Sequence, residues 1–133
     1  MNLVEVIHQR WASATALNDL LPASRVFTGL SVEATAPYGV ISSQRGRPAG
    51  RHNDGSALDS VAVRIEVFHD SHDDGQAVLE QIKAAFDRTD FALAGSDRVI
   101  DVQRAGDSRR QDGDGLWQFA IDFNCTVYLA TGV

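Results

Sequence analysis

Two long segments of the chain alternate strictly between apolar and polar side chains, and this alternation restricts the possible fold more than any other feature. One segment reads SVAVRIEVF and the other, which begins at Leu116, reads LWQFAIDFNCTVYL. A period of two sustained over such lengths predicts β-strands. The apolar positions are Val61, Val63, Ile65 and Val67 in the first segment and Trp117, Phe119, Ile121, Phe123, Cys125, Val127 and Leu129 in the second. Because Gln118, Asp122 and Asn124 lie on the opposite face, we expect an antiparallel sheet that is covered on one side only.

Two other segments show the three- and four-residue spacing of amphipathic helices. The first is Leu3–Leu20, which ends before Pro22. The second is Asp73–Arg88, preceded by Ser71, whose hydroxyl is expected to cap the helix in a pattern completed by Asp74. The buried stripe of this second helix is expected to comprise Val78, Leu79, Ile82, Ala85 and Phe86.

The remaining strands complete the predicted fold. They are expected at Arg25–Thr28, Tyr38–Gln44, Ala57–Phe68 and Arg98–Arg104, followed by the final strand that begins near Leu116. The order helix, three strands, helix, two strands predicts the α+β class, with a single antiparallel sheet of four or five strands and both helices packed on one face. We expect residues 1–133 to form a single domain. The predicted core contains Val63, Ile65, Val67, Ile82, Phe86, Trp117, Phe119, Ile121 and Phe123.

Two polar connectors, Arg45–Ala57 and Ala105–Gly115, are longer than ordinary hairpin loops. If their flanking strands pair, each connector forms the tip of a long hairpin that projects from the body, and we expect both to be mobile in the free subunit and ordered on assembly. Their arginines are Arg45, Arg47, Arg51, Arg109 and Arg110, interleaved with aspartates. Contact with another copy of the protein, a solvated loop and DNA contact are all compatible with this composition. Mixed charge favours the first, so these arginines are the predicted inter-subunit contacts.

Composition limits the remaining alternatives. The formal net charge of −6 disfavours a general nucleic-acid coat or a binder of anionic membranes, and no apolar run approaches the length needed to cross a bilayer. The single cysteine, Cys125, excludes an intramolecular disulfide and lies on the apolar face of the last strand, where it is expected to be an unreactive core residue.

Residues that could carry chemistry have simpler structural explanations. His69, His72 and the neighbouring aspartates are ligand types for a divalent ion, but they lie where a strand meets a helix, so we favour helix capping. The sequence from Asp112 to Gly115 resembles the start of a calcium loop, yet the twelfth position would be Phe123, so a turn is favoured. The only lysine, Lys83, is expected on the exposed side of the second helix.

Motifs for nucleophilic catalysis and for phosphate binding are missing from the sequence. We therefore expect no enzymatic activity, no cofactor and no metal. A small metal-dependent or nucleic-acid-binding accessory domain is the alternative interpretation.

Four segments together resemble the tail-completion proteins of tailed bacteriophages, a group that includes the tail terminators. These segments are PYGVI, VRIEVF, AVLEQIKAAFD and FAIDFNCTVY, which occur in this order over nearly the whole chain. One departure is Ser42-Ser43, where the family pattern continues with apolar or aromatic residues, and this departure affects the expected strand pairing there.

This resemblance implies a tail-terminator-like subunit with no catalytic residues, located in the tail or neck of a virion or phage-like particle and made in the bacterial cytoplasm. It implies assembly into a ring, commonly a hexamer, between the tail tube protein and a head-connector or stopper protein. It does not distinguish a phage from a prophage or a gene transfer agent.

Overall fold

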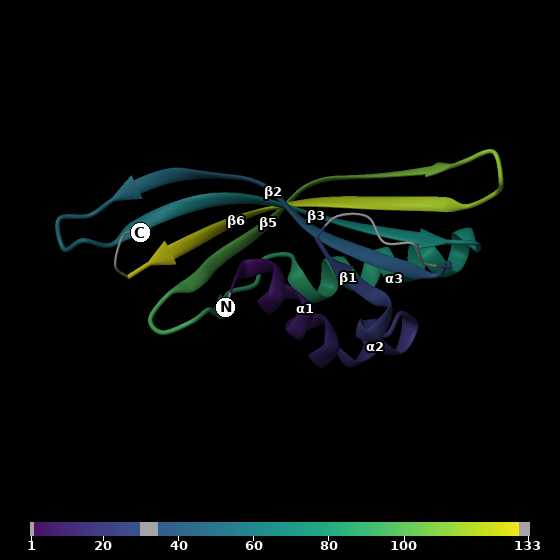
Figure 1. Cartoon of the computed structure of the whole chain (residues 1–133), viewed down its shortest axis with the longest axis horizontal. Helices are drawn as coiled ribbons and strands as arrows, with labels where there is room; N and C mark the ends of the chain where they lie inside the picture. The colour runs from purple at the N-terminus through teal and green to yellow at the C-terminus, as the bar shows by residue number, and fades with distance from the viewer. Residues whose placement is uncertain (1, 30–34, 131–133) are drawn as a thin grey trace.

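The protein folds into a long, twisted β-sheet with a layer of helices on one face, as the computed structural model in Figure 1 shows. The structure describes residues 2–29 and 35–130, without the side chains of Gln44 and Arg45. The elements are α1 (Leu3–Ser13), α2 (Thr15–Leu20), the 3-10 helix η1 (Ala23–Arg25), β1 (Val26–Thr28), β2 (Tyr38–Arg51), β3 (Ala57–His69), α3 (His72–Phe86), β4 (Phe91–Ala92), β5 (Arg98–Gln111) and β6 (Trp117–Leu129). None of the helices in these ranges is long and apolar enough to span a membrane.

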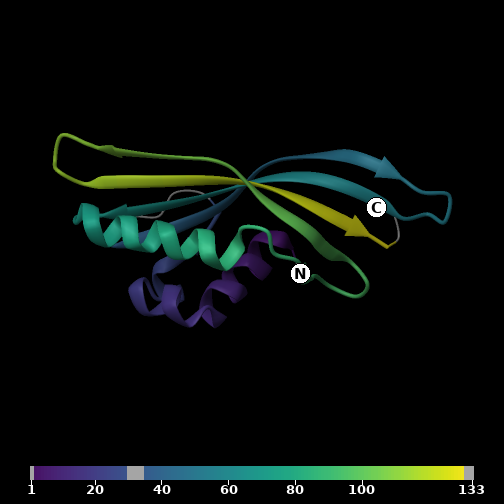
Figure 2. The same cartoon turned by 180° about the vertical axis from the view of Figure 1, so that it is seen from behind.

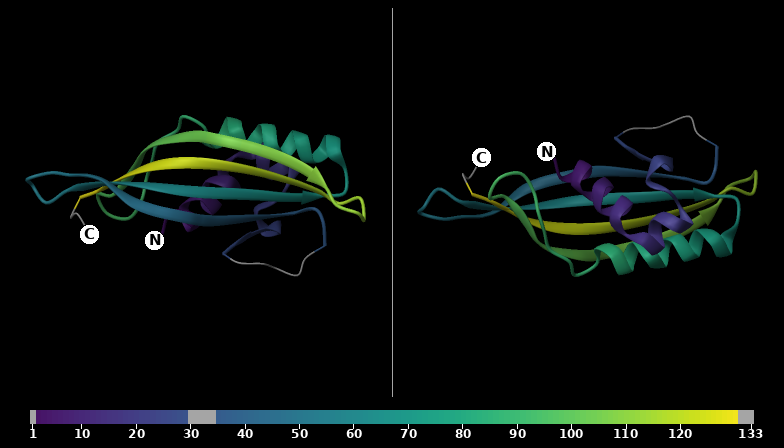
Figure 3. Two further views of the ribbon diagram at one scale, coloured as in Figure 1. Left: turned by 90° about the horizontal axis from the view of Figure 1, so that it is seen from above. Right: turned by 90° about the horizontal axis from the view of Figure 1, so that it is seen from below.

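The predicted sheet is wrong in both strand number and strand direction. Instead of a single antiparallel sheet of four or five strands, the described residues form a six-stranded mixed sheet in the order β1-β2-β3-β6-β5-β4. It is mixed because β1 pairs in parallel with β2, and the sheet curls strongly along its length (Figure 3). The two-residue strand β4 is too short to show any alternation, and nothing in a three-residue segment such as β1 reveals the direction of its partner.

The helices lie on one face of the sheet, as predicted, but the first predicted helix is divided in two (Figure 2). Ala14 adopts an extended conformation with ψ 91°, which ends α1 and lets α2 turn away. The turn allows the indole Nε1 of Trp11 to donate a hydrogen bond of 2.8 Å to the carbonyl of Leu21. Trp11, Leu17 and Leu21 are all buried, so packing decides a break that no glycine or proline marks in the sequence.

β2 and β5 are much longer than predicted, because most of each polar connector is strand. β2 pairs with β3 from Tyr38 to Arg51, and β5 pairs with β6 from Arg98 to Gln111. The predicted long hairpins are therefore confirmed, but the connectors themselves are not loops. β2 also continues through Ser42 and Ser43, with a register shift immediately afterwards.

Strand alternation and helix spacing predicted the core correctly except at Trp117. Val63, Ile65, Val67, Ile82, Phe86, Phe119, Ile121 and Phe123 are all at most 2% exposed, whereas Trp117 is half-buried and packs against this cluster. Asn124 is exposed, and Gln118 and Asp122 lie half-exposed on the opposite face. Cys125 is buried as predicted, and burial raises the pKa of its thiol to about 12, which makes it a poor nucleophile.

Candidate functional site: two hairpin tips of opposite charge

The two hairpin tips lie at opposite ends of the sheet, as Figure 1 shows at its left and right edges. We call residues 45–57 the β2–β3 tip and residues 105–115 the β5–β6 tip. Three arginines and one aspartate give the β2–β3 tip a formal charge of +2, and two arginines and three aspartates give the β5–β6 tip −1. A chain with a net charge of −6 thus has one basic hairpin tip.

The predicted contact arginines are divided between these tips rather than gathered in one site. Arg47 and Arg51 lie on β2 and are exposed, and their side chains have no hydrogen-bond or ion-pair partner among the described residues. The backbone of Arg45 also belongs to β2, but its side chain lies outside the described residues. Arg109 and Arg110 are exposed on β5, where the Nε of Arg110 donates a 2.9 Å hydrogen bond to Gln118.

The turns at the two tips have the same backbone arrangement. In the β2–β3 tip, the amide of His52 donates to the carbonyl of Ser56 at 2.9 Å, and in the β5–β6 tip the amide of Asp112 donates to the carbonyl of Leu116 at 3.0 Å. A glycine with positive φ occupies the fourth position of each turn: Gly55 with φ 90° and Gly115 with φ 85°. Both tips are therefore well-formed tight turns.

An aspartate stabilises each turn from within. The Asp54 carboxylate accepts hydrogen bonds from the hydroxyl and the amide of Ser56, at 2.6 and 2.9 Å, and these bonds lower the pKa of Asp54. Asp112 accepts from the amides of Asp114 and Leu116, at 2.9 and 3.1 Å. The turn predicted from Asp112 to Gly115 is therefore confirmed, and both carboxylates already have partners within their own turns.

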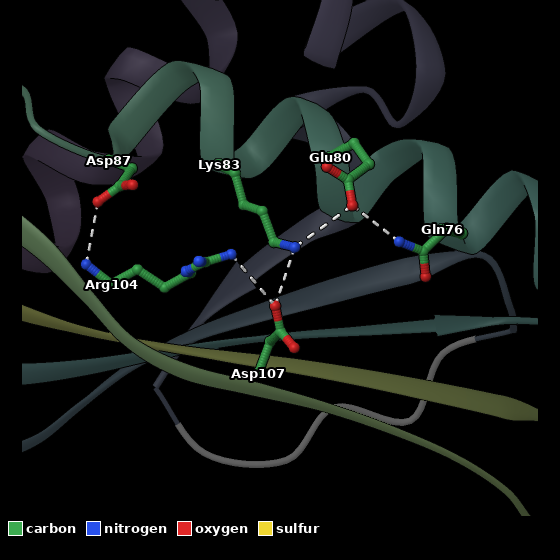
Figure 4. Close-up of polar contacts among 6 residues, drawn as sticks. All are labelled: Gln76, Glu80, Lys83, Asp87, Arg104 and Asp107. Atoms are coloured by element: carbon green, nitrogen blue, oxygen red, sulfur yellow. Dashed lines mark hydrogen bonds and ion pairs between the residues drawn. The ribbon is translucent and has the colours of Figure 1, made fainter.

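A polar cluster joins α3 to β5 and fixes the base of the β5–β6 tip (Figure 4). The ammonium of Lys83 lies 2.9 Å from a carboxylate oxygen of Asp107 and 3.3 Å from Glu80, while Arg104 approaches Asp107 at 3.7 Å. The hydrogen bond from Lys83 is the main cause that lowers the pKa of Asp107. Only 19% of the Lys83 side chain is exposed, so the prediction of an exposed lysine was wrong. Its partner, Asp107, lies in a segment that was predicted to be a loop.

The face of the sheet opposite the helices carries an ion pair and an aromatic cluster. Arg64 contacts Asp122 across β3 and β6 at 2.8 Å, and this hydrogen bond raises the pKa of Arg64. Nearby, the rings of Tyr38 and Phe68 stack with centroids 4.7 Å apart, and Phe27 meets Tyr38 edge-on at 6.4 Å. Sequence reasoning missed this cluster, although Phe68 at a polar-face position of an alternating strand was a detectable signal.

The region considered for metal binding is a helix cap. The hydroxyl of Ser71 accepts a hydrogen bond of 3.3 Å from the amide of Asp74, and the Nδ1 atom of the buried His69 accepts one of 3.1 Å from the Ser71 amide. The ring of His72 packs edge-on against Trp117, with centroids 4.7 Å apart. Within residues 2–29 and 35–130, no group of three or more His, Cys, Asp or Glu residues could hold a metal ion.

Both hairpin tips are charged and mostly exposed, and the comparisons with known proteins identify the class of this chain. Residues 5–128 match the family described as "Tail completion protein gp17". The chain belongs to this family and is a structural protein of a phage-type virion tail, which confirms the resemblance found in the sequence.

The fold agrees with a solved structure. A chain titled "Virion of native gene transfer agent (GTA) particle" superposes with a TM-score of 0.72 at 14% sequence identity, covering 97% of this chain and 100% of that chain. At this identity the likeness establishes the fold alone. Among curated proteins, none matches by sequence.

Proposed function

We propose that this protein terminates the tail tube and joins it to the head connector by closing into a ring, most simply a hexamer, as one tail-terminator-like domain. The tail tube protein on one side and a head-connector or stopper protein on the other would be its partners. In this proposal it has no catalytic activity, needs no cofactor and does not bind a specific nucleic-acid sequence.

The observation that carries the proposal is the opposite charge of tips that lie at opposite ends of the sheet. A ring made by head-to-tail association needs two different, complementary surfaces on each subunit. The β2–β3 tip has a formal charge of +2 and the β5–β6 tip −1. Asp107 is already paired with Lys83, so Asp112 and Asp114 are the acids that the β5–β6 tip offers to a neighbour. The side chains of Arg47 and Arg51 have no partner among the described residues of their own chain, so they are available to the acidic groups of the next copy.

The test is to delete the gene in its parent particle and to complement it with charge-reversed variants. Complementation with wild-type protein should restore tails of normal length that join heads, whereas the double variant Arg47→Glu/Arg51→Glu should fold but fail to restore joining. Arg88→Glu is the matched control, because Arg88 is exposed and its side chain has no partner in the described structure, but it lies on the body just after α3. Deletion mutants that still produce tails of normal length joined to heads at wild-type efficiency would disprove the function.

A further inference from the structure

The sheet has two edge segments that no strand of the described structure covers. β1 pairs only with residues 39–41 of β2, and β4 pairs only with residues 98 and 99 of β5. Among the described residues, no strand therefore pairs with the outer edge of residues 43–51 of β2 or of residues 106–111 of β5, and we call these two segments the open edges. Since β1 and β4 cover opposite ends of the sheet, the two open segments also lie at opposite ends (Figure 1).

The open segment of β5 is regular, and its backbone edge begins beyond the residues that follow α3, although the Lys83 side chain still reaches Asp107 at its base. At its base, the Val102 carbonyl accepts a 2.7 Å hydrogen bond from the Arg88 amide, and the Arg104 amide donates one of 3.0 Å to Asp87. Beyond this point, residues 106–111 pair with β6 without a register shift. Natural proteins usually protect so regular an edge, because it is a template for pairing with another strand.

The register shows which backbone groups of β5 are free to pair. The Asp112 amide donates to the Leu116 carbonyl, so the backbone groups of Asp112 point toward β6. Along a strand, the amide and carbonyl groups of successive residues point alternately to one neighbouring strand and to the other side. Residues 106, 108 and 110 consequently bond to β6. The amide and carbonyl groups of Asp107, Arg109 and Gln111 point toward the open edge.

The same reasoning applied to β2 gives a shorter edge. The inward bond between His52 and Ser56, together with register shifts after Ser43 and after Pro48, directs Gly46, Pro48 and Arg51 toward the open side. The bond from the Gly29 amide to the Ile41 carbonyl, 3.0 Å long, confirms this alternation at the other end of β2. Pro48 has no amide hydrogen, so this edge can form only a short ladder.

We propose that the open edge of β5 in one copy pairs antiparallel with the open edge of β2 in the next copy, so that the sheet continues from subunit to subunit. This inference rests on the proposed ring and specifies how its subunits join. β2, β3, β6 and β5 are successively antiparallel, so β5 runs opposite to β2. A neighbour in the same orientation therefore presents β2 in the antiparallel direction, as head-to-tail association requires.

We call this pairing of β5 with β2 of the next copy the joint, and both the positions of β1 and β4 and the charges of the tips fit it. β1 covers only residues 39–41, at the end of β2 away from its tip, and β4 covers only residues 98 and 99, at the end of β5 away from its tip, so neither short strand obstructs the overlap. The overlap also places the β2–β3 tip, at +2, beside the β5–β6 tip, at −1. A second copy of this chain therefore supplies both the missing strand and the opposite charge.

A proline substitution tests the backbone contact separately from the charge. Arg109→Pro removes an amide hydrogen from the middle of the open edge without removing a bond to β6, and Arg109→Ala is the matched control because it removes the same charge and keeps the amide. We expect Arg109→Pro to weaken subunit association about tenfold relative to Arg109→Ala, the effect of losing about one backbone hydrogen bond. Equal far-ultraviolet circular dichroism of the two variants shows that both are folded.

Cysteine cross-linking in purified tails provides the direct test. The double variants Arg47→Cys/Ser108→Cys and Arg47→Cys/Arg110→Cys place thiols on the same face of the two strands, and native Cys125 is buried. The two positions lie at opposite ends of one copy, so any disulfide must join different copies. We expect at least one double variant, and none of the single variants, to form covalent multimers on oxidation.

Failure of the joint is distinguishable from failure of the function. Tails that contain rings of this protein but give no cross-links, with Arg109→Pro associating as well as Arg109→Ala, would disprove the strand pairing and leave the ring intact. Tails that form and join heads normally without the protein would disprove the proposed function, and the joint with it.

Discussion

Replacing Gly75 with alanine should destabilise this protein, although the same change usually stabilises a helix. In an exposed helix interior, Gly→Ala gains about 0.5–1 kcal/mol. Gly75, however, is buried in the first turn of α3, and a Cβ atom there would lie 2.2 Å from Cε2 and 2.8 Å from Cζ of Phe119. The Phe119 ring is fully buried, so it has little room to move. Overpacking of this kind costs about 1–3 kcal/mol, and after the helix gain is subtracted the expected net loss is up to about 2.5 kcal/mol.

The assay is the free energy of unfolding from urea titration of Gly75→Ala and wild type. The control is the same substitution in a Phe119→Leu background, where the ring is absent and the helix preference of alanine should make the change neutral or stabilising. If Gly75→Ala raises the free energy of unfolding in the wild-type background, the packing of α3 on β6 described above is wrong.

Three further predictions concern individual residues. Arg88→Gly should raise the free energy of unfolding by about 0.5–1 kcal/mol in urea titration, because Arg88 has φ 60° just after α3 and glycine adopts that conformation without strain. The stabilising contribution of Asp107 should be fully present above the ordinary carboxyl pKa of 3.8 and lost as pH falls through the lowered pKa of Asp107 in the folded protein. The difference in free energy of unfolding between wild type and Asp107→Asn should therefore be constant near neutral pH and shrink below about pH 4. A difference that grows on acidification would contradict this prediction. Cys125 should resist thiol reagents at pH 8 in the native protein and react completely in denaturant, because burial raises its pKa to about 12.

The parts of the fold that the sequence predicted are those in which one face is buried. Phe119, Ile121 and Phe123 alternate with polar residues because the core lies on one side, and that contrast is visible in the sequence. The distal half of β5 shows no such contrast, because residues 103–111 are all exposed. Its strand conformation is set by pairing with β6, which a sequence window does not contain.

The β2–β3 tip was misread for a related reason. Gly46, Pro48 and Gly50 are unfavourable in strands, so the segment looked like a loop, yet each pairs with a residue of β3. The contact between Lys83 and Asp107 joins residues far apart in the sequence and was equally invisible. The candidate arginines could be predicted as exposed, but their division between two opposite ends depends on the three-dimensional sheet.

Electron cryomicroscopy of purified tails from the parent particle tests the central proposal most directly. Copies of this chain should form a closed ring at the head-proximal end of the tail tube, with the β2–β3 tip of each copy against the β5–β6 tip of the next. Tails whose end is closed by a different protein, or in which this chain occurs without contact between its copies, would contradict the account.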